Sequence, residues 1–232
     1  MTKKKEFEVT LPDVGEYQKE TMLAFEKEVL GVYISGHPLE EYEEKWRKSI
    51  SATTLDFQLD EETGRTKVRD GSREIIGGMI TSKMNQTMAF ITVEDLLGTV
   101  EVVIFPQSYE KSQQYLQEDS KVFVRGRVSE EDDNASKLIC EEVIPFDMTK
   151  KELWIQYADK QSYLQDEQNL FRMLAESEGE DQVVIFCKAE RAVKRLPKNA
   201  NIQVEPGILS RLTNYFGEDC VKVIEKPIEM KG

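Results

Sequence analysis

The chain contains 232 residues, more than one small barrel needs, and this length predicts two folded units with connecting segments. Its 39% hydrophobic and 32% charged residues exclude a disordered chain, and without an apolar run of about 18 residues we expect no membrane span. A net charge of −13 excludes a surface that attracts phosphate everywhere, so a nucleic-acid site requires a local basic stripe. The charged N-terminus lacks the apolar segment of a secretory signal, which favours a cytoplasmic protein.

Residues 1–48 are predicted to form a helical segment, because apolar residues recur at helical spacing. The first helix is expected to pack on one face and to end near Ser35-Gly36, and Pro38 then suits the first turn of a second. The two apolar sets are Met22, Phe25, Val29 and Val32, followed by Leu39, Tyr42 and Trp46. We interpret His37, the single histidine, as a turn or cap residue rather than a catalytic base, because no nucleophile or paired carboxylate is visible nearby.

Residues 49–72 are polar and carry turn signals at Gly64 and Asp70-Gly71, which predicts a connector with or without a short hairpin. Residues 73–147 then show the order strand, strand, strand, helix, strand, strand. These segments are Ile75–Lys83, the strand pair Met88–Pro106 with a turn at Gly98, the helix Tyr109–Glu118, and the strands Lys121–Ser129 and Lys137–Pro145. The order predicts a five-stranded Greek-key barrel of the OB type, which often binds single-stranded nucleic acid or oligosaccharide.

Alternation within the strand pair separates an inward face from an outward face. The inward set is Ala89, Ile91, Val93, Val100, Val102 and Ile104, and the outward set is Met88, Phe90, Thr92, Glu101, Val103 and Phe105. Ligands of OB barrels normally lie across strands two and three, between the loops that join strands one to two and four to five. The outward set is therefore the place to expect a ligand.

Six residues are candidates for nucleic-acid binding: Lys83, Phe90, Phe105, Arg125, Arg127 and Lys137. The two phenylalanines are candidates for stacking on bases, with packing under the helix or a neighbouring domain as the alternative. The two arginines alternate with valines, so their guanidinium groups are expected to point away from the core and to hold phosphates. The two lysines flank the relevant loops, with simple solvation as the alternative.

Acidic residues oppose this interpretation. Residues 73–147 contain seven Lys and Arg against 14 Asp and Glu. The unfavourable positions are Glu101 on the outward face and Glu130, Glu131, Asp132 and Asp133 in the loop after the fourth strand. Any DNA binding is therefore expected to be weak and salt-sensitive.

Residues 148–232 predict a small α+β domain. Its strands are expected at Leu153–Tyr157, Gln182–Lys188 and Cys220–Glu225, and its helices at Ser162–Ala175 and Pro206–Tyr215. A basic run is interpreted as a solvated helix or loop face, with nucleic acid or an acidic partner as alternatives; it comprises Lys188, Arg191, Lys194, Arg195 and Lys198. The three separated cysteines predict reduced thiols, and no motif predicts a catalytic residue, a metal site or a cofactor.

The segment EKEVLGVYISGHPLEEY (26–42), then Gly77-Gly78 and MAFITVEDLLGTVEVVIFP, resembles the C-terminal region of the bacterial replicative DNA polymerase III alpha subunit, the DnaE type. The resemblance is strong from about residue 11 to 145 and weaker beyond. It implies an OB domain followed by a domain that contacts the clamp-loader tau subunit. It also implies an upstream catalytic palm that is absent here, so that the chain is a fragment or truncated homologue.

Two details of the sequence depart from that family. Family members commonly carry a longer, basic loop between the first two strands of the barrel, whereas residues 80–88 contain only Lys83. The stretch Glu167–Phe171 approaches the clamp-binding pentapeptide, but Glu167 replaces its glutamine and the surrounding pattern is helical.

Two hypotheses follow. In the first, the chain is a noncatalytic polymerase module whose barrel weakly contacts single-stranded template DNA. In the second, it is an interaction platform for tau and other replisome proteins, with little DNA contact. Taken together, the sequence predicts a mainly β chain with α+β character: a helical segment (1–48), a connector (49–72), an OB barrel (73–147) and a small α+β domain (148–232).

Overall fold

The structure is a computed structural model that describes residues 15–85, 88–130 and 135–230. The chain divides into two compact units, residues 1–41 and 42–232, which are described separately. Within the described ranges, no helix combines the length and the apolarity that a membrane crossing needs.

The first unit contains one helix, α1 (Lys19–Leu30). It ends at Gly31, whose left-handed backbone (φ 77°) lets its N–H donate to the carbonyl oxygen of Lys27. Because glycine adopts this conformation without a steric penalty, it is a common helix stop. The helix therefore ends before the predicted Ser35-Gly36, and that expectation is corrected.

Side chains organise the turns that follow α1. The Glu26 carboxylate accepts the N–H groups of Ile34 and Ser35 at 2.7 and 2.9 Å. The ring Nδ1 of His37 accepts the N–H of Leu39 at 3.1 Å. This hydrogen bond agrees with the interpretation of His37 as a turn residue.

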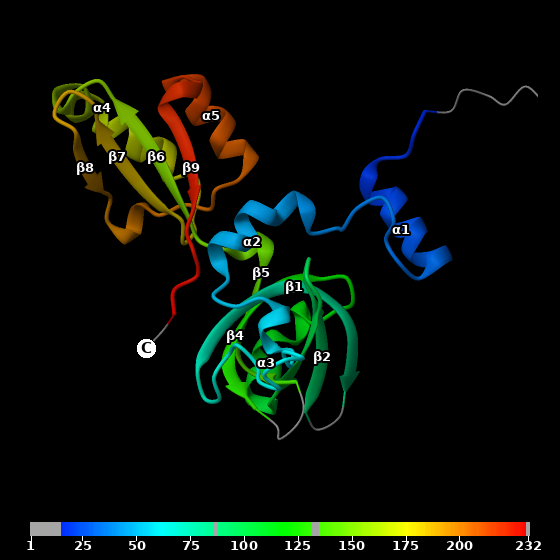
Figure 1. Ribbon diagram of the computed structural model, residues 1–232. Helices are drawn as coiled ribbons and strands as arrows, with labels where there is room; N and C mark the ends of the chain where they lie inside the picture. Colours follow the sequence, from blue (N-terminus) through cyan, green and yellow to red (C-terminus); the bar gives the residue numbers. More distant parts are fainter. Residues whose placement is uncertain (1–14, 86–87, 131–134, 231–232) are drawn as a thin grey trace, which may run out of the picture. The chain divides into compact units, whose positions relative to one another are not determined.

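The second unit starts with helical turns and continues into a closed barrel with strand order β1-β2-β3-β5-β4 (Figure 1). The turns of the second unit are α2 (Glu43–Ser49) and η2 (Thr54–Phe57), and η1 (Glu40–Tyr42) precedes them across the boundary between the units. The turn η2 occupies the connector in which the sequence left a short hairpin open. The barrel elements are β1 (Arg73–Asn85), β2 (Ala89–Glu94), β3 (Thr99–Ile104), α3 (Pro106–Ser112), η3 (Gln113–Tyr115), β4 (Lys121–Ser129) and β5 (Lys137–Pro145). The predicted five-stranded barrel is confirmed.

The barrel core is built from the alternating residues that the sequence assigned inward. Ile91 is 1% exposed, and Val93, Val102 and Ile104 are fully buried. Gly78 allows β1 to approach β2 closely, because a Cβ added there would lie 2.3 Å from the carbonyl oxygen of Glu94. The period-two pattern thus fixes which residues fill the interior.

One part of the barrel exterior is covered by other residues of the same unit, and we call it the covered side. Phe123 on β4 stacks on Phe146, with ring centroids 4.1 Å apart. The indole Nε1 of Trp46 on α2 donates to the carbonyl oxygen of Gly77 at 2.7 Å. Both Phe123 and Trp46 are at most 1% exposed.

The C-terminal residues form a four-stranded sheet of order β8-β7-β6-β9 with two main helices. Its elements are η4 (Phe146–Met148), β6 (Lys151–Tyr157), α4 (Lys160–Leu174), β7 (Gln182–Cys187), β8 (Ala192–Arg195), η5 (Lys198–Ala200), α5 (Pro206–Phe216), η6 (Glu218–Cys220) and β9 (Val221–Glu225). Leu170 on α4 and Leu212 on α5 are fully buried with Leu153 and Ile155 of β6, so the helices cover one face of the sheet.

Two expectations for this region change. The basic run forms β8 and its turn, so it is neither a helix nor only a loop. The stretch Glu167–Phe171 lies inside α4. Its Leu170 is buried in the core, so this side chain is not accessible to a clamp.

Candidate nucleic-acid interface

The other part of the barrel exterior carries a row of register-paired side chains, which we call the outer row. Phe90 on β2 pairs with Met84 on β1 and with Val103 on β3. Val103 pairs with Ile139 on β5, which in turn pairs with Arg127 on β4. Because paired residues share a face of the sheet, the row joins an aromatic and apolar strip to a cation.

Accessibility along the outer row suits a stacking surface. Met84 is 64% exposed, Phe90 and Ile139 are half-buried, and Arg127 is exposed. Val103 is only 7% exposed and supports its neighbours. Among the described residues, no carboxylate lies within ion-pair distance of Arg127. Its guanidinium is therefore available to an external anion.

A second row beside the outer row is polar. The Ser82 hydroxyl donates a hydrogen bond to the Thr92 hydroxyl at 2.8 Å, and Thr92 pairs with Glu101 on β3. Glu101 forms an ion pair with Lys137 at 3.1 Å. The acidic residue that opposes phosphate binding is thereby partly neutralised, and Lys137 is correspondingly less available to a ligand.

The expectation that Arg125 holds a phosphate is corrected. Its side chain points away from the core as predicted, but the residue is only 6% exposed. One nitrogen of its guanidinium forms an ion pair with Glu142, and another donates to the carbonyl oxygen of Glu229 at 3.0 Å. Arg125 belongs to the covered side and takes no part in the outer row.

Lys83 and Phe105 lie at the margins. Lys83 pairs with the core residue Ile91, so it lies on the inward side near the end of the barrel, with its Nζ 5.4 Å from the centre of the Tyr109 ring. Phe105 is 45% exposed at the start of α3, on the same side of the chain as Val103. Of the six predicted residues, Phe90 and Arg127 belong to the outer row, with Val103 and Ile139 between them, and Lys137 lies beside the row.

The loops flanking the interface are described only in part. Glu130 is exposed, and its N–H donates to the Asp70 carboxylate at 3.0 Å. Glu131, Asp132 and Asp133 lie outside the described residues, as does part of the loop between β1 and β2. The expectations about both loops therefore stay predictions.

Two residues of the outer row, Ile139 and Met84, were not among the predicted site residues. Ile139 follows the inward Leu138, so alternation along β5 carries the signal that it faces outward. Met84 could not be placed by alternation, because the pairing of β1 with β2 shifts between Ile80 and Ser82. Such a bulge reverses the faces that a strict period of two assigns.

Metal chemistry has no visible support in the described part of the chain, since no group of three or more His, Cys, Asp or Glu side chains is arranged to hold an ion. The outer row offers stacking, apolar contact and one cation. These are means of binding a ligand rather than of reacting with it.

Comparisons with known proteins agree with this geometry. Residues 74–146 match the family of OB-fold nucleic acid binding domains. DNA polymerase III subunit alpha of Bacillus subtilis (strain 168) is 26% identical over 210 residues, which are 86% of this chain and 18% of that protein. The same subunit of Escherichia coli (strain K12) is 27% identical over 218 residues, 89% of this chain and 18% of that protein.

Among solved structures, asparaginyl-tRNA synthetase from Pyrococcus horikoshii aligns with 38% of this chain and 22% of its own at a TM-score of 0.31 and 19% identity. The chain spans about a fifth of the length of the curated relatives it matches. Over most of its own length it resembles DNA polymerase III subunit alpha, and its barrel has the OB fold.

Proposed function

We propose that the chain is a noncatalytic module of a bacterial replicative DNA polymerase, DNA polymerase III alpha, whose barrel binds single-stranded DNA through the outer row. The observation that carries this proposal is the register that places Phe90 beside the exposed Met84 and ends in Arg127, which has no carboxylate within ion-pair distance among the described residues. Bases stack on such aromatic rings with about 1–3 kcal/mol per base and little sequence preference. The arginine supplies a phosphate contact.

The acidity of the barrel sets the expected strength of binding. Glu101 beside the row and the excess of carboxylates repel a phosphate backbone at short range. Salt screens the attraction between phosphates and Arg127, and DNA that binds at this single cation releases fewer counterions than DNA that binds a basic surface. We therefore expect binding that is weak at low salt and weaker still at moderate salt.

The direct test is fluorescence anisotropy of a labelled thymidine oligonucleotide titrated with the full chain at low and moderate salt. Arg127→Ala and Phe90→Ala should each weaken binding several-fold. The control is Arg65→Ala, which removes an exposed arginine from the connector. Absence of binding at low salt, or equal affinities for all three variants, would contradict the proposal.

The noncatalytic part of the proposal has its own test. The full chain, supplied with a primed template, Mg²⁺ and labelled deoxynucleoside triphosphates, should incorporate no label. Incorporation above that of a heat-denatured sample would show nucleotidyl transfer and overturn this part.

A second candidate function is a platform for replisome proteins, with the clamp-loader tau subunit as the expected partner. It is favoured by an exposed apolar surface on the two helices of the C-terminal domain. Leu164 on α4 is 56% exposed and Tyr215 on α5 is 51% exposed. The Tyr215 hydroxyl donates to Asp166 at 2.7 Å, which links the two helices at this surface.

Pull-down of tau by the full chain tests the second candidate. Leu164→Glu should abolish capture, whereas Gln165→Glu, at an adjacent exposed position, should leave it intact. Capture that survives Leu164→Glu would remove this surface from consideration.

A further inference from the structure

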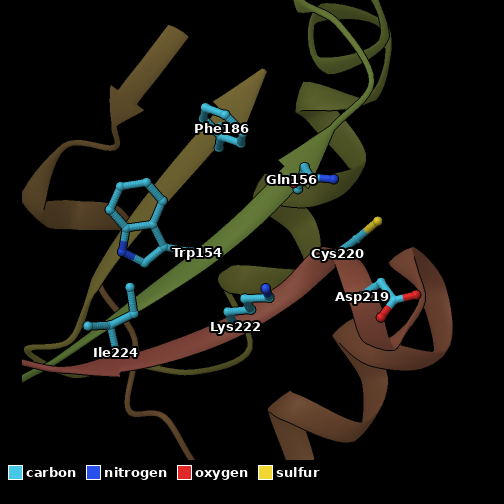
Figure 2. A pocket seen from close by; sticks show the side chains of 7 residues that line it. All are labelled: Trp154, Gln156, Phe186, Asp219, Cys220, Lys222 and Ile224. Carbon is cyan, nitrogen blue, oxygen red and sulfur yellow. The ribbon is translucent and has the colours of Figure 1, made fainter. Parts of the chain in front are cut away.

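The four-stranded sheet has a second face, opposite α4 and α5, that carries two aromatic rings. Trp154 lies on β6 and Phe186 on the neighbouring β7, and Figure 2 shows both on this open face. Both residues are half-buried, so each ring keeps an accessible surface. They line a hollow of about 250 Å³ together with Gln156, Lys222 and Ile224.

Register places a cation at each end of a line through Trp154. Trp154 pairs with Lys222 on β9 and with Val184 on β7, and Val184 pairs with Arg195 on β8. At about 4.8 Å between neighbouring strands, the two cations stand about 14 Å apart across the sheet. A chain of phosphates crossing this line would meet positive charge on both sides of the rings.

The orientation of the indole is fixed by a neighbour on the same strand. Trp154 Nε1 donates to a carboxylate oxygen of Glu152 at 3.0 Å. Glu152 is only 5% exposed and also forms an ion pair with Lys226 at 2.7 Å. The negative charge of Glu152 is therefore compensated by Lys226 and shielded from solvent, and its hydrogen bond to Nε1 fixes the orientation of the indole.

The remaining charges favour an anionic ligand. Among the described residues, no carboxylate lies within ion-pair distance of Lys222, and Lys222 and Arg195 are both exposed. Arg195 lies 3.8 Å from Glu152, a loose contact that leaves its other nitrogens open. Of the described residues that line the hollow, Asp219 is the one acidic side chain, and it lies in η6, just before the start of β9.

We infer that this open face is a second binding site for single-stranded nucleic acid, separate from the barrel, in which bases stack on Trp154 and Phe186 and phosphates contact Lys222 and Arg195. Stacking explains two rings on adjacent strands, since every base offers a π-face. Charge complementarity favours this occupant over an apolar peptide, because the line of residues ends in cations in an otherwise acidic chain. Gln156, on the same face, supplies an amide that can hydrogen-bond to a base edge.

Tryptophan fluorescence of the full chain tests the inference directly. The chain has two tryptophans, and Trp46 is 1% exposed with its Nε1 bonded to Gly77. Quenching by a thymidine oligonucleotide at low salt should therefore report Trp154. It should persist in Trp46→Phe and disappear in Trp154→Phe.

Substitutions that keep the reporter then test the ligand chemistry. Lys222→Ala combined with Arg195→Ala should weaken the midpoint of quenching at least tenfold, and Phe186→Leu several-fold. Arg172→Ala, which removes an exposed arginine from α4 behind the sheet, is the matched control and should leave the midpoint unchanged. Circular dichroism of every variant should match that of the parent chain.

The barrel site is separated by repeating the titration in Phe90→Ala with Arg127→Ala. Quenching of Trp154 that persists there supports a distinct site, whether or not the barrel itself binds DNA. Three results would overturn the inference: no quenching at low salt, quenching lost with the barrel residues, or quenching unaffected by the loss of Lys222 and Arg195. Equal quenching by polyglutamate would also overturn it, by showing a charge site for acidic peptides without base stacking.

Discussion

Arg125 and Arg127 lie two residues apart on β4, and both point away from the barrel core, yet they meet opposite surroundings. Arg125 is buried on the covered side and bonded to Glu142 and Glu229, whereas Arg127 is exposed at the end of the outer row. The difference arises from what other segments place over the strand rather than from the strand itself. In a closed barrel, facing outward is therefore not the same as being available to a ligand.

The largest expected effect on stability distinguishes a phenylalanine on the covered side of the barrel from one in the outer row. Phe123→Ala should lower the free energy of unfolding by about 3–5 kcal/mol, because it empties a fully buried position that stacks on Phe146. Phe90→Ala on the open outer row should cost about 1 kcal/mol or less. Urea denaturation of both variants measures the contrast, and equal losses would show that Phe90 is a structural residue instead of a stacking surface.

Cysteine reactivity gives a second contrast, between the barrel core and the C-terminal sheet. Burial, aided by the charges of Glu141 and Glu142, raises the pKa of Cys140 to about 12. Each unit by which the pKa rises lowers the thiolate fraction tenfold, so at pH 8 Cys140 should react with iodoacetamide at least about 100-fold more slowly in the folded than in the urea-unfolded chain. The half-buried Cys220 is the second thiol of the comparison and should be labelled first in the folded chain. Mass spectrometry of timed samples measures the two rates. Comparable labelling in the native chain would show that the barrel opens readily.

The same thiol contributes to the pH dependence of stability. The folded barrel keeps Cys140 protonated, whereas the unfolded chain releases this proton above about pH 8.5. The unfolded state then binds fewer protons than the folded state, so the contribution of Cys140 to stability is fully present below about pH 8.5 and is lost progressively as the pH rises toward the folded pKa of about 12. Cys140→Ala should remove this component from an alkaline denaturation series.

The adjacent glutamates Glu141 and Glu142 provide a third contrast, with an intermediate effect on the free energy of unfolding. Glu142→Ala should cost about 2 kcal/mol, since it leaves the buried Arg125 guanidinium without its carboxylate. Glu141→Ala breaks only a partly exposed pair with Arg73 and should cost about 0.5 kcal/mol. Thermal denaturation of the two variants should therefore show distinct midpoints, and coincident midpoints would mean that Arg125 finds another partner.

Local patterns predicted the barrel well because its strand pair is local. The alternation from Ala89 to Ile104 assigned the core residues correctly, since neighbouring strands and a tight turn leave few other arrangements. The strand β8 was not predicted, because all four of its residues are exposed at a sheet edge. Such a strand lacks the alternation of apolar and polar residues by which strands are recognised in a sequence.

The candidate site was predictable only in part. The outward direction of Arg125 followed from alternation, but its burial depends on Glu229, which lies 104 residues away in the sequence. No pattern within β4 carries that information. Phe90 and Arg127, by contrast, are brought together by pairings of the barrel itself, and the barrel topology was predicted.

The smallest expected effect concerns salt, and it tests whether the two arginines really differ toward DNA. The logarithm of the affinity for single strands falls against the logarithm of salt concentration by about 0.7 for each phosphate contact. Arg127→Ala should therefore reduce the magnitude of this slope by about 0.7, while Arg125→Ala should leave it unchanged, because its guanidinium already binds Glu142 and Glu229. Anisotropy titrations at four salt concentrations give the slopes. A reduced slope for Arg125→Ala with an unchanged slope for Arg127→Ala would place the DNA on the covered side and reverse the assignment of the two surfaces.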